Sequence, residues 1–380
     1  MNDRLSRRDF TKLAAAGALA PRLLNERVEH AARESALTSP WDGYARATVV
    51  DCLASPGPFN VRNALASPLT DEMVKNAKDS GITAVNLTVA SGDFQSVFES
   101  MGYWERELRV HPDVLTKVAS VADLKRAKET GRLGLIYGFQ NAVMLGTDLG
   151  RLDLFYNFGV RIIQLTYNDR NALGDGCLEP ANAGLSRFGR AVVERMNELG
   201  MLVDLGHCGV QTTADAIAVS KKPVAITHSG CRAVYDHPRS KRDQELKALA
   251  DRGGVIGIYL MPFLSGRSGP SMADDLIKHI EHAVNVCGED HVGIGSDCSV
   301  TPHVVDAEYI AEHKAFVEAR VRRGISAPRE DQYYFTPDLN SPRRMEMIAD
   351  KLLARGHSSA RVQKIVGGNF ARLFGEVWAA

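Results

Sequence analysis

Short hydrophobic runs alternate with amphipathic stretches along most of this chain. The runs are rich in Val, Ile and Leu and end near Gly, Ser, Asp or His, as buried parallel strands do. Eight such candidate strands are Ala47–Leu53, Thr83–Val89, Leu133–Tyr137, Arg161–Thr166, Met201–Leu205, Pro223–Thr227, Gly254–Tyr259 and His291–Gly295. Stretches between them, such as Phe188–Leu199 and Met272–Cys287, carry apolar residues on one side at helical spacing. This alternation predicts the α/β class.

Eight strand–helix units in one chain predict a closed (β/α)8 barrel of the TIM type. A doubly wound open sheet is the main alternative, and a ninth strand at Leu115–Ser120 stays open. Two C-terminal helices are expected, Pro342–Ala354 and Ser359–Val366. We interpret the interval Thr301–Pro337 as a barrel insertion or lid.

The N-terminus predicts export. Ser6-Arg7-Arg8-Asp9-Phe10-Thr11-Lys12 precedes a mild apolar stretch, Leu13–Leu24, in the order of a bacterial twin-arginine signal. An ordinary basic amphipathic helix is the alternative. We therefore expect residues 1–40 to be export signal and linker, residues 41–380 to be the barrel domain, and the mature protein to be periplasmic.

Composition excludes several classes of protein. Lys+Arg and Asp+Glu both number 46, so the basic excess of a nucleic-acid-binding surface is missing. No apolar run is long enough for a transmembrane helix in the mature chain. Six cysteines in 380 residues are not the framework of a small disulfide-rich domain; buried thiols and a single disulfide both stay open.

Polar residues at the carboxyl ends of the predicted strands are the candidates for chemistry, because barrel active sites lie there. They are Asp51, Gln140, Tyr167, His207, His228 and Asp297. His207 and His228 follow consecutive strands, so their side chains could share one metal ion. A lone histidine in such a place is more often structural, but two at matched positions favour a metal site.

Two further residues suit a small polar substrate. Asp297 follows a Gly-rich strand end and could bind an amine, a metal or a proton, although a helix cap is the plain alternative. Arg239 follows His228 closely and could pair with a carboxylate, although a solvated surface arginine is commoner.

In combination these motifs resemble the membrane (renal-type) dipeptidase family of the amidohydrolase superfamily. The resemblance runs from about Val49 to Phe370. It is carried by Leu165-Thr166-Tyr167-Asn168, Asp204-Leu205-Gly206-His207, Thr227-His228-Ser229 with the downstream Arg239-Ser240, and Gly293-Ile294-Gly295-Ser296-Asp297.

The resemblance implies roles for the matching residues. That family binds two zinc ions bridged by a glutamate and hydrolyses dipeptides. By resemblance, His207 and His228 are ligands of the second metal, Arg239 holds the substrate carboxylate, and Asp297 meets the substrate amine and handles the proton. Tyr167 stands where the family has a substrate-binding histidine, and its phenol could still donate a hydrogen bond.

The first metal site departs from the family pattern. Leu53 and Ser55 stand where the family has its His and Asp ligands, and Gln140 stands where it has the bridging glutamate. None of these is a good zinc ligand. We therefore expect one zinc ion rather than two, held by His207 and His228, with Asp51 and Gln140 as weak further candidates.

Three functions follow, in order of preference. The first is an exported hydrolase that cleaves a dipeptide or similar small amide with a metal-activated water. The second is an impaired family member that binds a small zwitterion without hydrolysis. The third is a metal-free lyase or isomerase, which only the versatility of barrel folds supports. The expected partner is a small molecule; a homodimer stays open.

Overall fold

Eight parallel strands close into a barrel in the computed structural model, which describes residues 41–60, 65–89 and 92–378. Around the ring the order is β3-β1-β10-β9-β8-β7-β6-β5, and β5 pairs back with β3. The ring strands are β1 (Val50–Asp51), β3 (Ala84–Thr88), β5 (Leu133–Phe139), β6 (Val160–Gln164), β7 (Leu202–Asp204), β8 (Ala225–Ser229), β9 (Val255–Ile258) and β10 (Val292–Ile294). The predicted barrel is confirmed, and the open-sheet alternative is wrong.

Three short strands lie outside the ring. β4 (Leu115–Lys117) pairs with the first half of β5, at the place where the sequence left a ninth strand open. β2 (Ala54–Ser55) and β11 (Cys298–Ser299) form a two-stranded parallel sheet just beyond the ends of β1 and β10. This small sheet fixes the two segments that carry Ser55 and Asp297.

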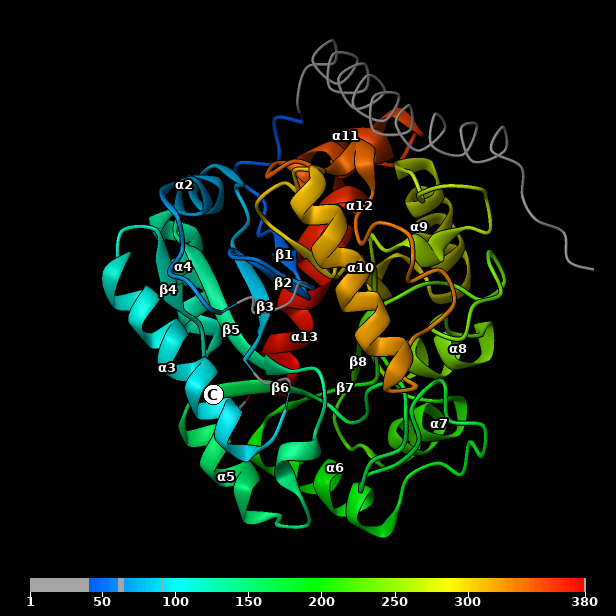
Figure 1. The fold of residues 1–380 in the computed structure, drawn as a ribbon. Helices are drawn as coiled ribbons and strands as arrows, with labels where there is room; N and C mark the ends of the chain where they lie inside the picture. Colours follow the sequence, from blue (N-terminus) through cyan, green and yellow to red (C-terminus); the bar gives the residue numbers. More distant parts are fainter. Residues whose placement is uncertain (1–40, 61–64, 90–91, 379–380) are drawn as a thin grey trace, which may run out of the picture.

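Helices surround the barrel (Figure 1). They are α2 (Asp71–Asp79), α3 (Phe94–Val110), α4 (Val121–Thr130), α5 (Gly150–Asn157), α6 (Arg187–Leu199), α7 (Val210–Val219), α8 (Asp243–Asp251), α9 (Ala273–Cys287), α10 (Ala307–Arg322), α11 (Arg344–Ala354), α12 (Ser359–Gln363) and α13 (Asn369–Val377). α6 shows how local sequence sets such bounds: the Ser186 hydroxyl accepts from the Gly189 amide, and Gly200 ends the helix at φ +73°. The expected helices at 188–199 and 272–287 are confirmed within one residue at each end.

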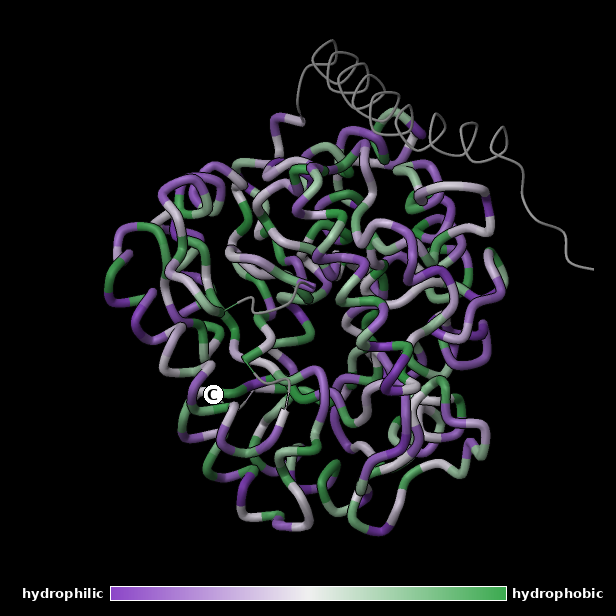
Figure 2. Tube along the Cα trace, in the orientation of Figure 1, coloured by the Kyte–Doolittle hydropathy of each residue, from purple (hydrophilic) through white to green (hydrophobic). Residues whose placement is uncertain are grey.

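The last helix, which the pattern did not predict, closes the amino end of the barrel. Phe370, Leu373, Phe374 and Trp378, on and just after α13, pack against inward-facing residues near the strand starts. Gly293 leaves room for them, because a Cβ there would lie 2.6 Å from the Phe370 ring. Figure 2 shows the green, hydrophobic stretches along the barrel strands and the purple ones mainly on the outer helices and loops. With this end filled, only the carboxyl ends of the strands remain for a site.

The expected export segment, residues 1–40, lies outside the described residues. Within the described chain, no helix is long and apolar enough to cross a membrane. All six cysteines are free, and four of them are buried, so none forms the single disulfide that the sequence left open.

Candidate functional site

Two histidines meet at the carboxyl ends of β7 and β8. His207 follows β7 directly and His228 lies within β8, and their ring centroids are 5.0 Å apart. Both rings are buried. The strand ends therefore bring together the two residues whose matched positions suggested a shared site.

Hydrogen bonds fix the same tautomer in both rings. Asn168 donates its amide N–H to the Ile325 carbonyl, so its Oδ1, 2.6 Å from His207 Nδ1, accepts a proton from that nitrogen. The Thr227 hydroxyl donates to Asp204 at 2.7 Å and therefore accepts from His228 Nδ1 at 2.8 Å. Each Nε2 is thus left with its lone pair, which is the arrangement of a metal-ligating histidine.

Electrostatics keep both imidazoles neutral. Burial, then the nearby Arg239 guanidinium, lowers the pKa of His207 and of His228 well below the usual range. His207 Nε2 has no hydrogen-bond partner among the described residues, while His228 Nε2 lies 3.5 Å from the Gln140 amide nitrogen. Two buried lone pairs without strong partners suit a cation or a donor group of a ligand.

Arg239 presents a free donor to the same space. Its Nη1 donates to the Gly206 carbonyl at 2.7 Å, and its guanidinium lies 5.9 Å from the Tyr259 ring centroid. Ser229 and His237 hold its backbone. Its Nη2 is buried and finds no partner in the described part of the chain. A buried guanidinium with one arm committed and one free is suited to bind a carboxylate.

Asp297 occupies a turn between β10 and β11 with the left-handed backbone value φ +60°. Its amide donates to the Leu53 carbonyl at 2.8 Å, and Asn60 donates to its carbonyl oxygen at 2.8 Å and to its carboxylate at 3.4 Å. Burial raises the pKa of this carboxyl to about 7, against the lowering effect of Arg239. The group can therefore both hold and release a proton near neutral pH.

This pKa predicts a pH-dependent effect of Asp297→Asn on stability. The folded protein favours the protonated carboxyl, so between about pH 4 and about pH 7 it binds more protons than the unfolded chain, and stability falls as the pH rises. The variant lacks this titration. Its free energy of unfolding, relative to the wild type, is expected to rise across that interval and stay level above it. Urea unfolding at pH 5, 6 and 8 measures this; a constant difference would contradict the burial effect.

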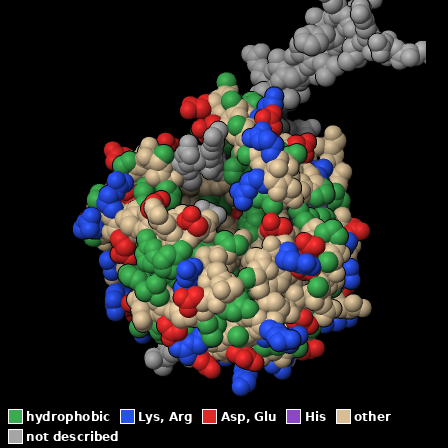
Figure 3. All heavy atoms as spheres, turned by 60° about the horizontal axis from the view of Figure 1, so that its bottom comes forward, with side chains coloured by type: hydrophobic (Ala, Val, Ile, Leu, Met, Phe, Trp, Pro, Cys, Tyr) green, Lys and Arg blue, Asp and Glu red, His purple; other side chains and the backbone are tan. Residues whose placement is uncertain are grey.

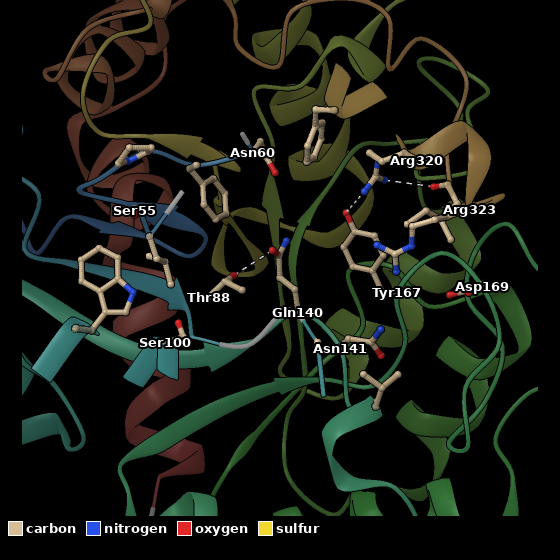
Figure 4. A pocket seen from close by; sticks show the side chains of 18 of the residues that line it. Ser55, Asn60, Thr88, Ser100, Gln140, Asn141, Tyr167, Asp169, Arg320 and Arg323 are labelled. Carbon is tan, nitrogen blue, oxygen red and sulfur yellow. Dashed lines mark hydrogen bonds between the residues drawn. The ribbon is translucent and has the colours of Figure 1, made fainter. Parts of the chain in front are cut away.

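Tyr167 is held by an arginine that the sequence reasoning missed. Arg320, near the end of α10, donates to the Tyr167 hydroxyl at 3.0 Å (Figure 4). It also makes two 2.7 Å hydrogen bonds with Glu330. The Tyr167 ring stacks on His207 with centroids 4.0 Å apart. Burial raises the pKa of the phenol, so it keeps its proton. Since Arg320 can only donate, the phenol proton remains available for a ligand.

The segment carrying Arg320 lies over the barrel mouth, where Figure 1 shows α10 crossing in front of the strands. Asn168 donates to Ile325 of this segment, and His237 lies 2.9 Å from the Pro328 carbonyl. These contacts support the interpretation of the interval 301–337 as an insertion that covers the mouth. Only long-range contacts reveal Arg320, because on sequence it is one of four arginines between Arg320 and Arg329.

Asp51 is not available as a metal ligand. Its carboxylate accepts from the Ser296 amide at 2.7 Å and pairs with Arg344 at 3.2 Å, and all three residues are buried. This pair joins β1 to α11. The prediction of Asp51 as a weak candidate metal ligand is therefore wrong. The residue stabilises the structure behind the site through its ion pair with Arg344.

The residues at the family's first metal position form no ion site. Leu53 is fully buried, and the Ser55 hydroxyl accepts from the Gly57 amide at 3.2 Å. Gln140 accepts from the Thr88 hydroxyl at 3.0 Å. Within the described ranges, no three His, Cys, Asp or Glu residues are grouped to hold a metal ion. The two histidines supply imidazole nitrogens for an ion, whereas Leu53, Ser55 and Gln140 supply neither a carboxylate nor an imidazole.

These residues surround two connected spaces. The inner chamber, about 10 Å³, is lined by His207, Arg239 and Asp297 among others. The outer cavity, about 580 Å³, is lined by Ser55 and Gln140 among others. Figure 3 shows that the surface of the molecule is hollowed on one side. The inner chamber has room for about one water molecule and adjoins the outer cavity through shared lining residues.

Comparisons with known proteins place this barrel among the amidohydrolases. An amidohydrolase from Pseudomonas aeruginosa is 31% identical, with a TM-score of 0.79 over 90% of this chain and 99% of that one. A metallo peptidase from Rhodobacter sphaeroides, liganded with a phosphinate mimic of the dipeptide L-Ala-D-Ala, shares the fold at 17% identity and a TM-score of 0.70, over 87% of this chain and 99% of that one.

The family follows from the sequence match. The model of the membrane dipeptidase family, peptidase family M19, matches residues 67–330, and the chain belongs to this family. Dipeptidase tcpJ of Claviceps purpurea is 29% identical over 266 residues, which are 69% of this chain and 62% of that protein. Dipeptidase verJ of Clonostachys rogersoniana is 32% identical over 200 residues, 52% of this chain and 51% of that protein. The chain thus spans between about half and six-tenths of the length of these curated relatives.

Proposed function

We propose that this protein is a hydrolase that cleaves a dipeptide or a similar small amide carrying a free carboxylate. The observation that carries the proposal is the buried Nη2 of Arg239, which has no hydrogen-bond partner among the described residues, on a side chain that lines the same chamber as His207 and Asp297. Family membership supports the reaction class. Burying the Arg239 guanidinium without a bound anion costs free energy, so its presence here favours a ligand with an anionic group.

The chain's own residues divide the work of binding and proton transfer. Arg239 binds the carboxylate and thereby sets where the amide bond lies. Tyr167 donates a hydrogen bond from its phenol to an oxygen of the substrate, and Arg320 orients that phenol. Asp297 takes a proton from the water whose oxygen bonds to the carbonyl carbon, and passes it to the amine as the C–N bond breaks, for which a pKa near 7 is well matched. The covering insertion keeps bulk water from the inner chamber.

His207 and His228 would hold one metal ion, with zinc as the expected identity because imidazole nitrogen is a preferred zinc ligand. When bound, such an ion supplies Lewis acidity at the scissile carbonyl. The tautomers fixed by Asn168 and Thr227 support this assignment. Catalytic zinc normally has three protein ligands; because the Gln140 carboxamide oxygen already accepts from Thr88, we expect a substrate atom to complete the set.

We further propose that the protein acts in the periplasm after export by the twin-arginine route. The support is the motif from Ser6 to Lys12 and the apolar stretch that follows it. That route carries folded proteins, so a metal ion could be loaded before export.

Matched pairs of substrates test the proposed function. Dipeptides such as L-Ala-D-Ala, and their C-terminal carboxamides, would be incubated with zinc-supplied protein and the products quantified by mass spectrometry. The carboxamides lose the charge that Arg239 binds, so kcat/KM is expected to fall about 30-fold or more, from the 2–5 kcal/mol typical of breaking a buried charge pair. Equal kcat/KM for a dipeptide and its carboxamide would contradict the role of Arg239. Binding without products would indicate a binding protein instead.

A further inference from the structure

The outer cavity is far larger than the site needs for a carboxylate and an amide. Its volume of about 580 Å³ lies within the range of pockets that enclose drug-sized ligands. Figure 4 shows Ser55, Thr88, Gln140 and Tyr167 arranged around it, with Arg320 and Arg323 on another side. A substrate that reaches the inner chamber must leave some part of itself in this space.

The outer cavity and the inner chamber adjoin each other. Four residues line both: Asn60, Tyr167, Phe316 and Arg320. They come from three separate segments and form a neck, because Asn60 also binds Asp297 and Arg320 also binds Tyr167. The outer cavity therefore adjoins the inner chamber beside Asp297 and Tyr167.

Two residues that by resemblance stand at metal-ligand positions line this cavity. Ser55 and Gln140 both do so, whereas Leu53 is packed fully into the core. A serine and a neutral amide leave space and hydrogen-bonding groups where an ion and its carboxylates would exclude an apolar group. Gln140 keeps a fixed orientation through its hydrogen bond with Thr88. The altered first metal position thus extends the substrate site.

The walls suit an apolar group with a polar link. Six of the described lining residues are large and apolar: Phe59, Leu65, Trp104, Val143, Phe316 and Ile325. The indole N–H of Trp104, a residue only 1% exposed, has no partner in the described chain. An aromatic group of a ligand could pack on these side chains while the link binds Gln140 or Asn141.

The charges around the cavity disfavour a cation there. Its charged lining residues are Asp169, Arg170, Arg320 and Arg323. Arg170 pairs with Asp175, and Arg320 pairs with Glu330, so neither pair offers a free carboxylate. A free ammonium group would meet three arginines and one exposed aspartate. An uncharged substituent fits better.

We infer that the outer cavity is a subsite for a bulky, uncharged, mainly aromatic group on the acyl side of the scissile amide. The substrate class is therefore an amide of an amino acid whose acyl side is large, either an N-aroyl or arylacyl amino acid or a dipeptide with a large aromatic first residue. This inference rests on the proposed function for the position of the carboxylate and the amide.

Binding of N-acylglycines tests the subsite without requiring turnover. Calorimetry would give the Kd of acetylglycine, benzoylglycine and 2-naphthoylglycine for the zinc-supplied protein. Burial of the added ring surface is expected to tighten binding about 10-fold or more from acetyl to naphthoyl. Val143→Trp fills the cavity from an exposed position and is expected to remove this gain, whereas Val110→Trp, which is also exposed but lies on α3 outside the cavity, should preserve it.

The outcomes separate this inference from the proposed function. A Kd that does not change with acyl size, absence of binding by all three ligands, or a gain that survives Val143→Trp would overturn the subsite. Graded binding with no hydrolysis of any amide would leave the subsite standing and refute the hydrolase. Hydrolysis of L-Ala-D-Ala without any preference for larger acyl groups would support the hydrolase and refute the subsite.

Discussion

Replacing Arg239 by Met is expected to lower kcat/KM for a carboxylate-bearing amide by about 30- to 5,000-fold, because truncating one partner of a buried charge pair costs about 2–5 kcal/mol. Methionine keeps the length and packing of the side chain but loses its charge and its donors. The buried Nη2, which has no partner among the described residues, disappears with them. The same variant should treat a dipeptide and its carboxamide alike, since it has no group left that distinguishes them.

Two controls separate recognition from damage to the fold. Arg239→Lys keeps the positive charge but lacks the paired N–H donors of the guanidinium, so an intermediate loss of kcat/KM is expected. Arg126→Met removes an exposed arginine on α4 that lines neither cavity, and should change kcat/KM by less than about 3-fold, as surface charges contribute little. If Arg239→Met still prefers the carboxylate by as much as the wild type does, the carboxylate is bound elsewhere.

The second large effect concerns stability. Arg344→Met is expected to lower the free energy of unfolding by about 3–5 kcal/mol, because it leaves the buried Asp51 carboxylate without its partner. Arg344 also donates to Ser296 at 3.1 Å and to the Cys298 carbonyl at 3.3 Å. Its loss therefore loosens the segment that carries Asp297.

Urea unfolding at pH 7 measures this loss. Arg343→Met is the matched control, since the neighbouring Arg343 is partly exposed and pairs with Glu346 on the same helix; it should cost less than about 1 kcal/mol. Asp51→Asn combined with Arg344→Met should recover part of the loss, because no uncompensated charge remains. A single Arg344→Met variant as stable as Arg343→Met would show that the pair does not hold this part of the barrel.

Much of the fold could be predicted from hydrophobic pattern. Parallel strands buried on both faces are continuous apolar runs, so all eight barrel strands were found. The pattern missed α13, because Gly367-Gly368 reads as the end of a helix rather than as a turn between two. The expected strand ends also differ by a few residues: the first run, 47–53, pairs in the ring only at Val50 and Asp51.

Some residues of the site could also be predicted from the sequence, and others could not. His207 and His228 were predictable, since strand ends lie side by side in a parallel barrel. Arg320 was not, because it reaches Tyr167 across 153 residues from an insertion whose path no periodicity specifies. Asp51 has the expected position but a different partner, because the pattern contains no information on Arg344 in the distant α11.

Bound metal per chain tests most directly the claim that this is a single-ion hydrolase site opened to a large substrate. Elemental analysis of protein purified without chelator and without added metal, beside His207→Ala, is the measurement. We predict about one zinc ion per wild-type chain and none in His207→Ala, in keeping with ligation by His207 and His228. Two ions per chain would contradict the assignment of the first metal position to the substrate cavity, and an ion retained by His207→Ala, or none in the wild type, would contradict the histidine site.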